Sequence, residues 1–143
     1  MTYATQQDLI DRFGTTELVQ LTDKVNKPAS VIDPTPIARA LNDASAFIDG
    51  YLKKVTKLPL TVVPPVLTKT AADIARYYLH GKSADKDSQV TRAYTEASKW
   101  LVDVSRGLVE LTDGGEAPAA SGGGSVKSSA PNRVFTRDSL RHY

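Results

Sequence analysis

Cysteine is absent from this chain of 143 residues. Its absence excludes a disulfide framework, a thiolate zinc site and a cysteine nucleophile, and it fits a reducing compartment. Histidine occurs only at His80 and His142, which lack the spacing of a ligand pair. We therefore expect neither a metal site nor a bound cofactor.

Long apolar runs and a strong charge imbalance are also missing. No segment approaches the roughly 18 apolar residues of a membrane helix, and residues 1–14 have neither the basic nor the apolar region of a secretory signal. The net charge of +2 gives no reason to expect strong non-specific binding to nucleic acid. Hydrophobic and charged contents of 41% and 24% are typical of one soluble globular domain with a modest core.

Apolar residues recur at helical spacing along most of the chain. They predict five helices, three of them long, over residues 6–13, 15–23, 33–55, 65–80 and 88–106. Strand content should be low, although residues 108–111 could form a short extended piece. The predicted fold class is all-α, a small helical bundle of about five helices.

Capping residues mark the first two helices. Thr5 is placed to cap the first, which Gly14 would end, and Thr15 or Thr16 would cap the second. Residues 24–34 read as a long, exposed loop.

The third helix has the clearest pattern. Asp33 or Thr35 supplies its cap, and Pro36 suits the first helical position. Gly50 lowers helix stability by about 1 kcal/mol, so a close helix crossing would explain its presence. The predicted buried stripe consists of Ile37, Leu41, Ala44, Phe47, Ile48, Tyr51, Leu52 and Val55.

The last two helices are bounded by prolines and glycines. Pro65 begins one and Gly81 follows its end, while Asp87 or Ser88 caps the other and Gly107 stops it. The stripe of the fourth helix is Leu67, Ala71, Ile74 and Tyr78, with Val66 and Ala75 less central. That of the fifth is Val90, Ala93, Tyr94, Ala97, Trp100, Leu101 and Val104.

Catalytic patterns are not evident. The run GGGSVKSS lacks a glycine before Lys127 and a helix after it, so it reads as a linker and not as a phosphate loop. His80, beside Gly81 at a helix end, is placed to compensate the helix dipole. A hydrolase would need convergent titratable groups, which the sequence does not indicate. We expect no catalytic site and conclude that the chain is not an enzyme.

Two features of the main body could serve an interface. Lys53, Lys54 and Lys57 form its one basic cluster, which either complements the end of the long helix or contacts an acidic protein surface or DNA. Tyr77 and Tyr78 point about 100° apart on a helix, so they cannot both face the core. A tyrosine at the boundary, with Tyr77 as the candidate, suits a subunit interface.

The end of the chain divides into a tether and an adhesive peptide. Residues 1–112 form the helical domain, residues 113–131 are a flexible linker rich in Gly, Ser, Ala and Pro, and residues 132–143 are a docking peptide. Arginine and aromatic residues dominate interface energetics, so docking on a partner is favoured over an unstructured terminus. The candidate contacts are Arg133, Val134, Phe135, Arg137, Asp138, Leu140, Arg141 and Tyr143.

Several motifs occur together in a specific order. They are YATQQDLIDRFG…ELVQLTD, IARALNDASAFIDGYL, LPL…VPPVL…ADIARYYL and RVFTRDSL. Together they resemble the Mu-like bacteriophage structural proteins encoded near the capsid genes, a family similar to the head–tail adaptors of tailed phages. The likeness covers nearly the whole chain, except that Arg141, His142 and Tyr143 replace the family's glycine-aromatic ending.

The resemblance implies a helical subunit of a twelvefold ring beneath the portal, in the neck of the virion. Its partners would be the portal protein, neighbouring subunits and the next neck or tail protein. DNA would pass through the lumen without specific binding, no membrane would be involved, and assembly would take place in the host cytoplasm. The rival interpretation is a regulatory or scaffolding module that binds a protein but never enters the particle.

Overall fold

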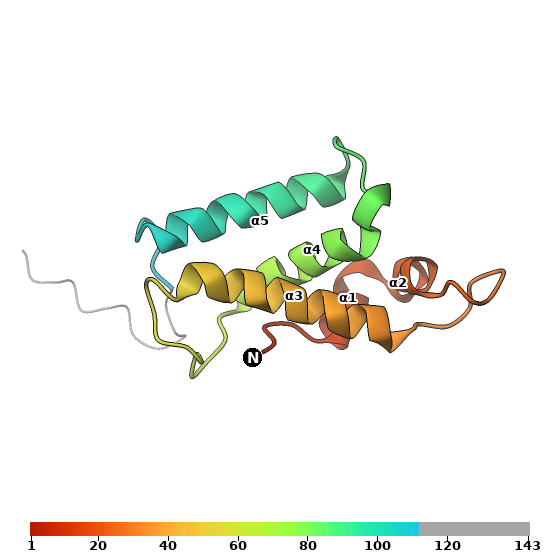
Figure 1. Ribbon diagram of the computed structural model, residues 1–143, viewed down its shortest axis with the longest axis horizontal. Helices are drawn as coiled ribbons and strands as arrows, with labels where there is room; N and C mark the ends of the chain where they lie inside the picture. Colours follow the sequence, from red (N-terminus) through yellow and green to blue (C-terminus); the bar gives the residue numbers. More distant parts are fainter. Residues whose placement is uncertain (112–143) are drawn as a thin grey trace, which may run out of the picture.

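The computed structural model describes residues 1–111 (Figure 1). Five α-helices and one 3₁₀ turn make up the regular structure of this part, which contains no strand. The all-α prediction is therefore confirmed. The linker at 113–131 and the peptide at 132–143 lie outside the described residues. The elements are α1 (Gln6–Phe13), α2 (Thr15–Thr22), α3 (Pro34–Leu52), α4 (Pro65–His80), η1 (Gly81–Ser83) and α5 (Gln89–Ser105).

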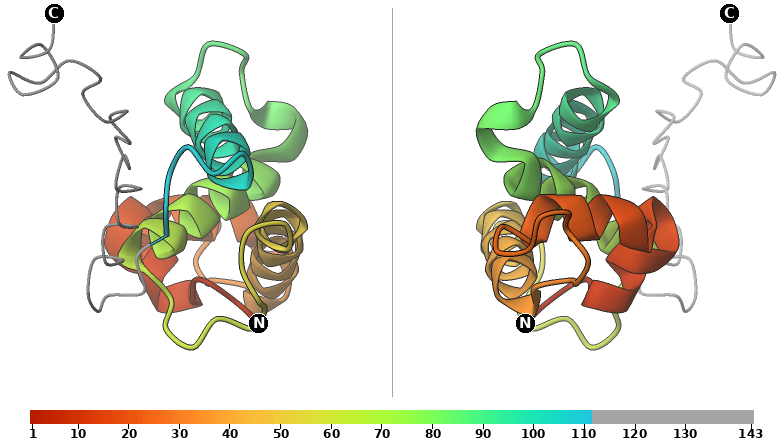
Figure 2. Two further views of the ribbon diagram at one scale, coloured as in Figure 1. Left: turned by 90° about the vertical axis from the view of Figure 1, so that its left-hand side faces the viewer. Right: turned by 90° about the vertical axis from the view of Figure 1, so that its right-hand side faces the viewer.

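Helix α4 is the central element of the bundle. It packs against both α3 and α5, while α1 and α2 pack on α3 and α4 (Figure 2). Helices α3 and α5 run in the same direction and end at the same end of the molecule, where the α3–α4 connector also lies (Figure 1). The α2–α3 loop projects from the opposite end. The bundle therefore has two distinct ends.

The first two helices follow each other without a spacer. The Thr5 hydroxyl accepts a hydrogen bond from the Asp8 N–H, and the Asp8 carboxylate accepts one from the Thr5 N–H, which forms a capping box. Gly14 has a φ of 84° and turns the chain directly into α2. The predicted Thr15 or Thr16 cap is therefore wrong, because Thr15 is already helical and Gly14 takes the cap position.

The first helical residue of α3 lies two positions before the predicted Pro36, and the helix ends at Leu52, before the predicted residue 55. The Asp33 carboxylate accepts a hydrogen bond from the Thr35 N–H at 2.9 Å, and Pro34, not Pro36, is the first helical residue. The chain leaves the helix after Leu52, so Val55 lies outside the core. A close crossing at Gly50 is wrong as well, since no atom lies within 4 Å of the place where a Cβ would stand.

Small residues are frequent among the buried positions of α3 and α4. Ala40 and Ala44 on α3 are buried, as are Ala71, Ala72 and Ala75 on α4. Their short side chains allow the two helices to approach closely. The largest fully buried side chains are Leu9, Leu18, Ile37, Ile48, Leu52, Leu67, Ile74, Leu101 and Val104.

Helices α4 and α5 have the predicted bounds, with Ser88 as the cap of α5 and Gly107, at a φ of 74°, beyond its end. The prediction that Val66 is buried is wrong, because this residue lies in the first turn of α4 and is 41% exposed. Residues 108–111 form no strand, although Val109 and Leu111 pack against the core.

Candidate interaction surfaces

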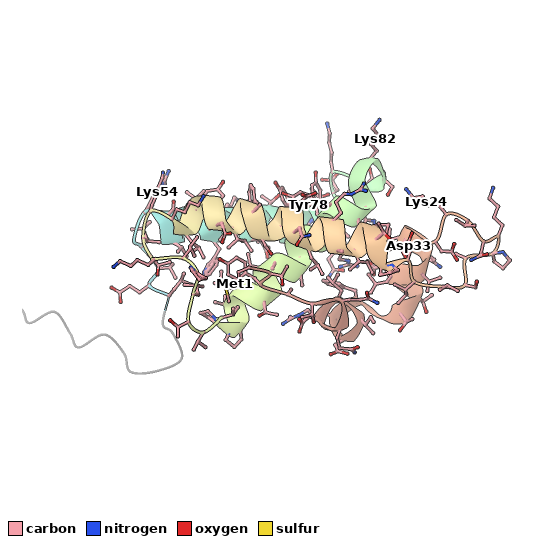
Figure 3. All side chains as sticks on the ribbon, turned by 60° about the horizontal axis from the view of Figure 1, so that its bottom comes forward. Met1, Lys24, Asp33, Lys54, Tyr78 and Lys82 are labelled. Atoms are coloured by element: carbon pink, nitrogen blue, oxygen red, sulfur yellow. The ribbon has the colours of Figure 1, made fainter. Side chains whose placement is uncertain are left out.

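The predicted lysine cluster lies at the end of the bundle where α3 and α5 finish. Lys53 is the C-cap of α3, and Lys53, Lys54 and Lys57 are all exposed (Figure 3 labels Lys54). Residues 53–66 contain no Asp or Glu. Their positions suit both interpretations, a charge that complements the helix end and a contact with an acidic surface.

Exposed apolar side chains accompany these lysines. Val55 and Val62 belong to the α3–α4 connector, Val66 to the first turn of α4, and Leu108 to the segment after α5; they are between 41% and 71% exposed. We call this surface the basic end. It is formed by Lys53, Lys54 and Lys57 together with Val55 and Val62 of the same connector.

A single carboxylate organises the loop at the opposite end. Asp23 accepts hydrogen bonds from the backbone N–H groups of Val25, Asn26, Ser30 and Val31 at 3.0–3.2 Å, and from the Asn26 side-chain amide at 3.0 Å. The backbone N–H groups of Asn26 and Ser30 contribute most to holding the pKa of Asp23 below its usual range. We call the segment from residue 23 to residue 33 the Asp23 loop. Hydrogen bonds between its own residues hold its conformation.

The base of the Asp23 loop is closed by a second polar contact. The buried Thr22 hydroxyl accepts a hydrogen bond from the Asp33 N–H at 3.0 Å and donates one to the Leu18 carbonyl at 2.7 Å. The sequence identified this stretch only as an exposed loop. The signal that could have revealed its order is an Asp followed by Asn and Ser, residues that cap their own backbone in turns.

A cluster of charged groups joins α2 to α4. The Arg76 guanidinium donates two hydrogen bonds to the Glu17 carboxylate, at 2.6 and 2.8 Å, and stacks over Phe13 at 4.4 Å from the ring centroid. His80, which was expected only to compensate the helix dipole, is the last residue of α4 and places Nε2 3.2 Å from Glu17 Oε1. The cluster has the geometry of a structural tie between helices.

The pKa of Glu17 reflects two opposed effects. Burial raises it, but the hydrogen bonds and positive charge of Arg76, together with the hydrogen bond to His80, lower it below its ordinary value. The carboxylate is therefore held in its charged form, paired with Arg76.

Aromatic rings gather where α3, α4 and α5 meet. Tyr77 stacks on Tyr94, with centroids 4.2 Å apart and planes 14° apart, and Tyr94 also approaches Phe47 and Tyr78. Burial, followed by the effects of Tyr94, raises the pKa of Tyr78 to about 12. Tyr77 and Tyr78 are both half-buried, so both lie at the boundary of the core. One face of the Tyr77 ring is occupied by Tyr94, and its use in a subunit interface stays a prediction.

A recess beside these elements has mixed chemistry. It is open, has a volume of about 180 Å³, and lies between α2, α3 and α4. Its lining residues are Leu21, Lys24, Pro36, Arg39, Ala40, Asp43, Tyr78 and Leu79. Within residues 1–111 no group of three or more acidic or histidine side chains could hold a metal ion. In the same part of the chain no helix combines the length and apolarity needed to cross a bilayer.

The predicted docking peptide cannot be placed on this framework. Arg133, Val134, Phe135, Arg137, Asp138, Leu140, Arg141 and Tyr143 all lie outside the described residues.

Comparison with known proteins gives consistent results along the chain. The family model described as "Bacteriophage Mu, Gp36" matches residues 3–128. "Gene product J" of Escherichia phage Mu is 38% identical over 110 residues, which cover 77% of this chain and 76% of that protein. "Mu-like prophage FluMu protein gp36" of Haemophilus influenzae is 32% identical over 128 residues, 88% of each chain.

Proposed function

Because the chain belongs to the bacteriophage Mu Gp36 family, we propose that it is a head–tail adaptor of a Mu-like phage or prophage. In this role it forms a ring, twelvefold by analogy with other adaptors, under the portal protein. The ring extends the DNA channel and offers a surface to the next neck or tail protein. Its place is the neck of the virion, reached from the host cytoplasm during assembly.

The observation that carries this proposal is the distribution of exposed apolar groups. In residues 1–111, exposed large apolar side chains occur in the segments at both ends of the bundle: Val25 and Val31 in the Asp23 loop, and Val55 and Val62 in the α3–α4 connector. Exposed apolar groups with polar neighbours favour protein–protein contact. A molecule that joins two partners needs two such surfaces, set apart from each other.

The C-terminal peptide supplies a tethered contact in this proposal. Phe135 and Leu140 fill pockets on the portal protein or on a neighbouring subunit, and Arg137 pairs with a carboxylate there. A tether raises the effective concentration of the peptide, so a weak contact repeated around a ring holds the subunits in place.

The decisive experiment removes the peptide and leaves the helical domain intact. A stop codon after Pro131 should preserve the helical circular dichroism spectrum and the melting temperature but abolish incorporation into particles. A matched control replaces the exposed Glu96 by Gln, outside the peptide, and should assemble normally. Normal infectious particles built from the truncated protein would contradict the role of the peptide.

The location of the full-length protein tests the function itself. Mass spectrometry of purified virions should find the chain in a fixed ratio to the portal protein. Absence from virions would overturn the adaptor function and favour a module that binds a protein during assembly or regulation only.

A further inference from the structure

The Asp23 loop presents the most exposed large apolar side chain of residues 1–111. Val25 is 88% exposed and Val31 is 61% exposed. A single exposed valine on a surface needs no explanation. These two, however, belong to one loop, which projects from the end of the bundle (Figure 1).

The conformation of the loop is stabilised before any partner arrives. The N–H groups of Val25 and Val31 themselves donate to Asp23, at 3.1 and 3.2 Å, so the same carboxylate positions both side chains. The contact between Thr22 and Asp33 closes the base of the loop. A loop that is ordered in the free protein loses little conformational entropy on binding. Extended loops of this kind on a rigid scaffold are commonly binding loops.

The charge around the valines defines the partner. Lys27 follows Val25 by two residues and is exposed, whereas Lys24 borders the recess between α2, α3 and α4 (Figure 3 labels Lys24). The two carboxylates of the loop, Asp23 and Asp33, both accept hydrogen bonds from backbone N–H groups, and Asp33 caps α3 at the base of the loop. The exposed part of the loop is therefore apolar with a positive border, which complements an apolar recess bordered by carboxylates.

We propose that the exposed part of the Asp23 loop, formed by Val25, Lys27 and Val31, docks into an apolar recess rimmed by Asp or Glu on a different protein. A second copy of this chain is disfavoured as the occupant. The other exposed apolar surface, the basic end, carries Lys53, Lys54 and Lys57 and no carboxylate between residues 53 and 66. Like charges placed against each other oppose such a contact.

This docking site is independent of the adaptor function and of the C-terminal peptide. A partner found in the virion fits both proposals. A partner that never enters the particle would be consistent with the docking site but would contradict the adaptor function.

A photo-crosslinker in the exposed part of the loop identifies the partner. The residue p-benzoylphenylalanine replaces Val25 in the full-length chain, in cells where the lytic cycle has been induced. A control chain carries it in place of Lys86, which is exposed in the turn before α5. We expect position 25 to give an adduct with one different protein, through an apolar peptide flanked by Asp or Glu, well above the yield from position 86.

Binding of that purified protein to variants then tests the chemistry. Val25→Ser and Lys27→Glu should each weaken binding about fivefold or more, while Val25→Ile should bind as the parent does. Asp23→Ala keeps Val25, Lys27 and Val31 but loosens the loop, and it should also weaken binding several-fold because ordering then occurs on binding. Each variant should keep the helical spectrum of the parent.

Three outcomes would overturn the proposal. They are adducts only with another copy of this chain, a yield at position 25 no greater than at position 86, and binding by Val25→Ser that equals the parent.

Discussion

Glu17 on α2 and Arg76 on α4 are joined by two parallel hydrogen bonds of 2.6 and 2.8 Å, although 59 positions of sequence separate them. Their side chains are 25% and 18% exposed, so the pair is only partly screened by water. A two-pronged contact between guanidinium and carboxylate restricts orientation as well as distance. It therefore fixes how the short helix α2 lies on the central helix.

Replacing Glu17 by Gln should lower the free energy of unfolding by about 1–2 kcal/mol, because Arg76 then loses its charged acceptor in a partly buried site. Urea denaturation would measure this. Gln7→Ala is the control: the Gln7 side-chain amide donates a hydrogen bond to Asp11 one turn away at 2.7 Å, and both residues are exposed. Its loss should change stability by less than about 0.5 kcal/mol. Equal effects of the two exchanges would contradict the interpretation.

The same pair predicts a dependence on acid pH. The pKa of Glu17 is lowered on folding from an ordinary value of 4.5, so its contribution to stability is complete above that pH and is lost as the pH falls through the folded value. The stability difference between the parent and Glu17→Gln should therefore be largest at neutral pH and shrink below pH 4.5. Urea titrations at several pH values would test this, and a difference that grows on acidification would contradict it.

The buried alanines of α3 and α4 should be sensitive to an increase in side-chain size. Ala71→Leu inserts a larger side chain where the exposure of Ala71 is 0%, and it should destabilise the protein by about 1–3 kcal/mol or more. Ala46→Leu, on the exposed face of α3, is the control and should have little effect. Thermal melting distinguishes the two, and equal melting temperatures would show that the two helices do not require close contact.

Charge reversal at the basic end separates assembly from folding. Lys53, Lys54 and Lys57 are exposed, so exchanging all three for Glu should leave the melting temperature nearly unchanged. If the basic end meets an acidic surface, the exchange should reduce incorporation into particles severalfold. Lys82→Glu together with Lys86→Glu is a control elsewhere on the surface. Unimpaired incorporation of the triple variant would exclude this end as a docking surface.

The helix bounds were largely predictable because they depend on local chemistry. Thr5, Asp33 and Ser88 cap the following helix through their own side chains, and such signals are short in sequence. The errors were also local. Thr15 looked like a cap because Gly14, with its positive φ, was expected only to end α1.

The polar contacts between distant residues could not be predicted. Nothing in the neighbourhood of Glu17 indicates Arg76 or His80, since their contact depends on how α2 settles on α4. Tyr3 is another case: it is 3% exposed and its hydroxyl donates a hydrogen bond to Asp49 on α3, which no short pattern reveals. For Val66, helical spacing predicted burial, but the spacing does not reveal that the first turn of α4 extends beyond its neighbours.

Helix α3 connects the two ends of the bundle, since it begins at the Asp23 loop and ends at Lys53. Its 19 residues span about 28 Å, and its hydrogen bonds run along its axis. A pulling force applied between partners at the two ends would therefore stretch α3 lengthwise and shear it against α4, loading many contacts at once. Peeling, in which contacts break one after another, would require a sideways force. The molecule is thus suited to carry tension along its long axis.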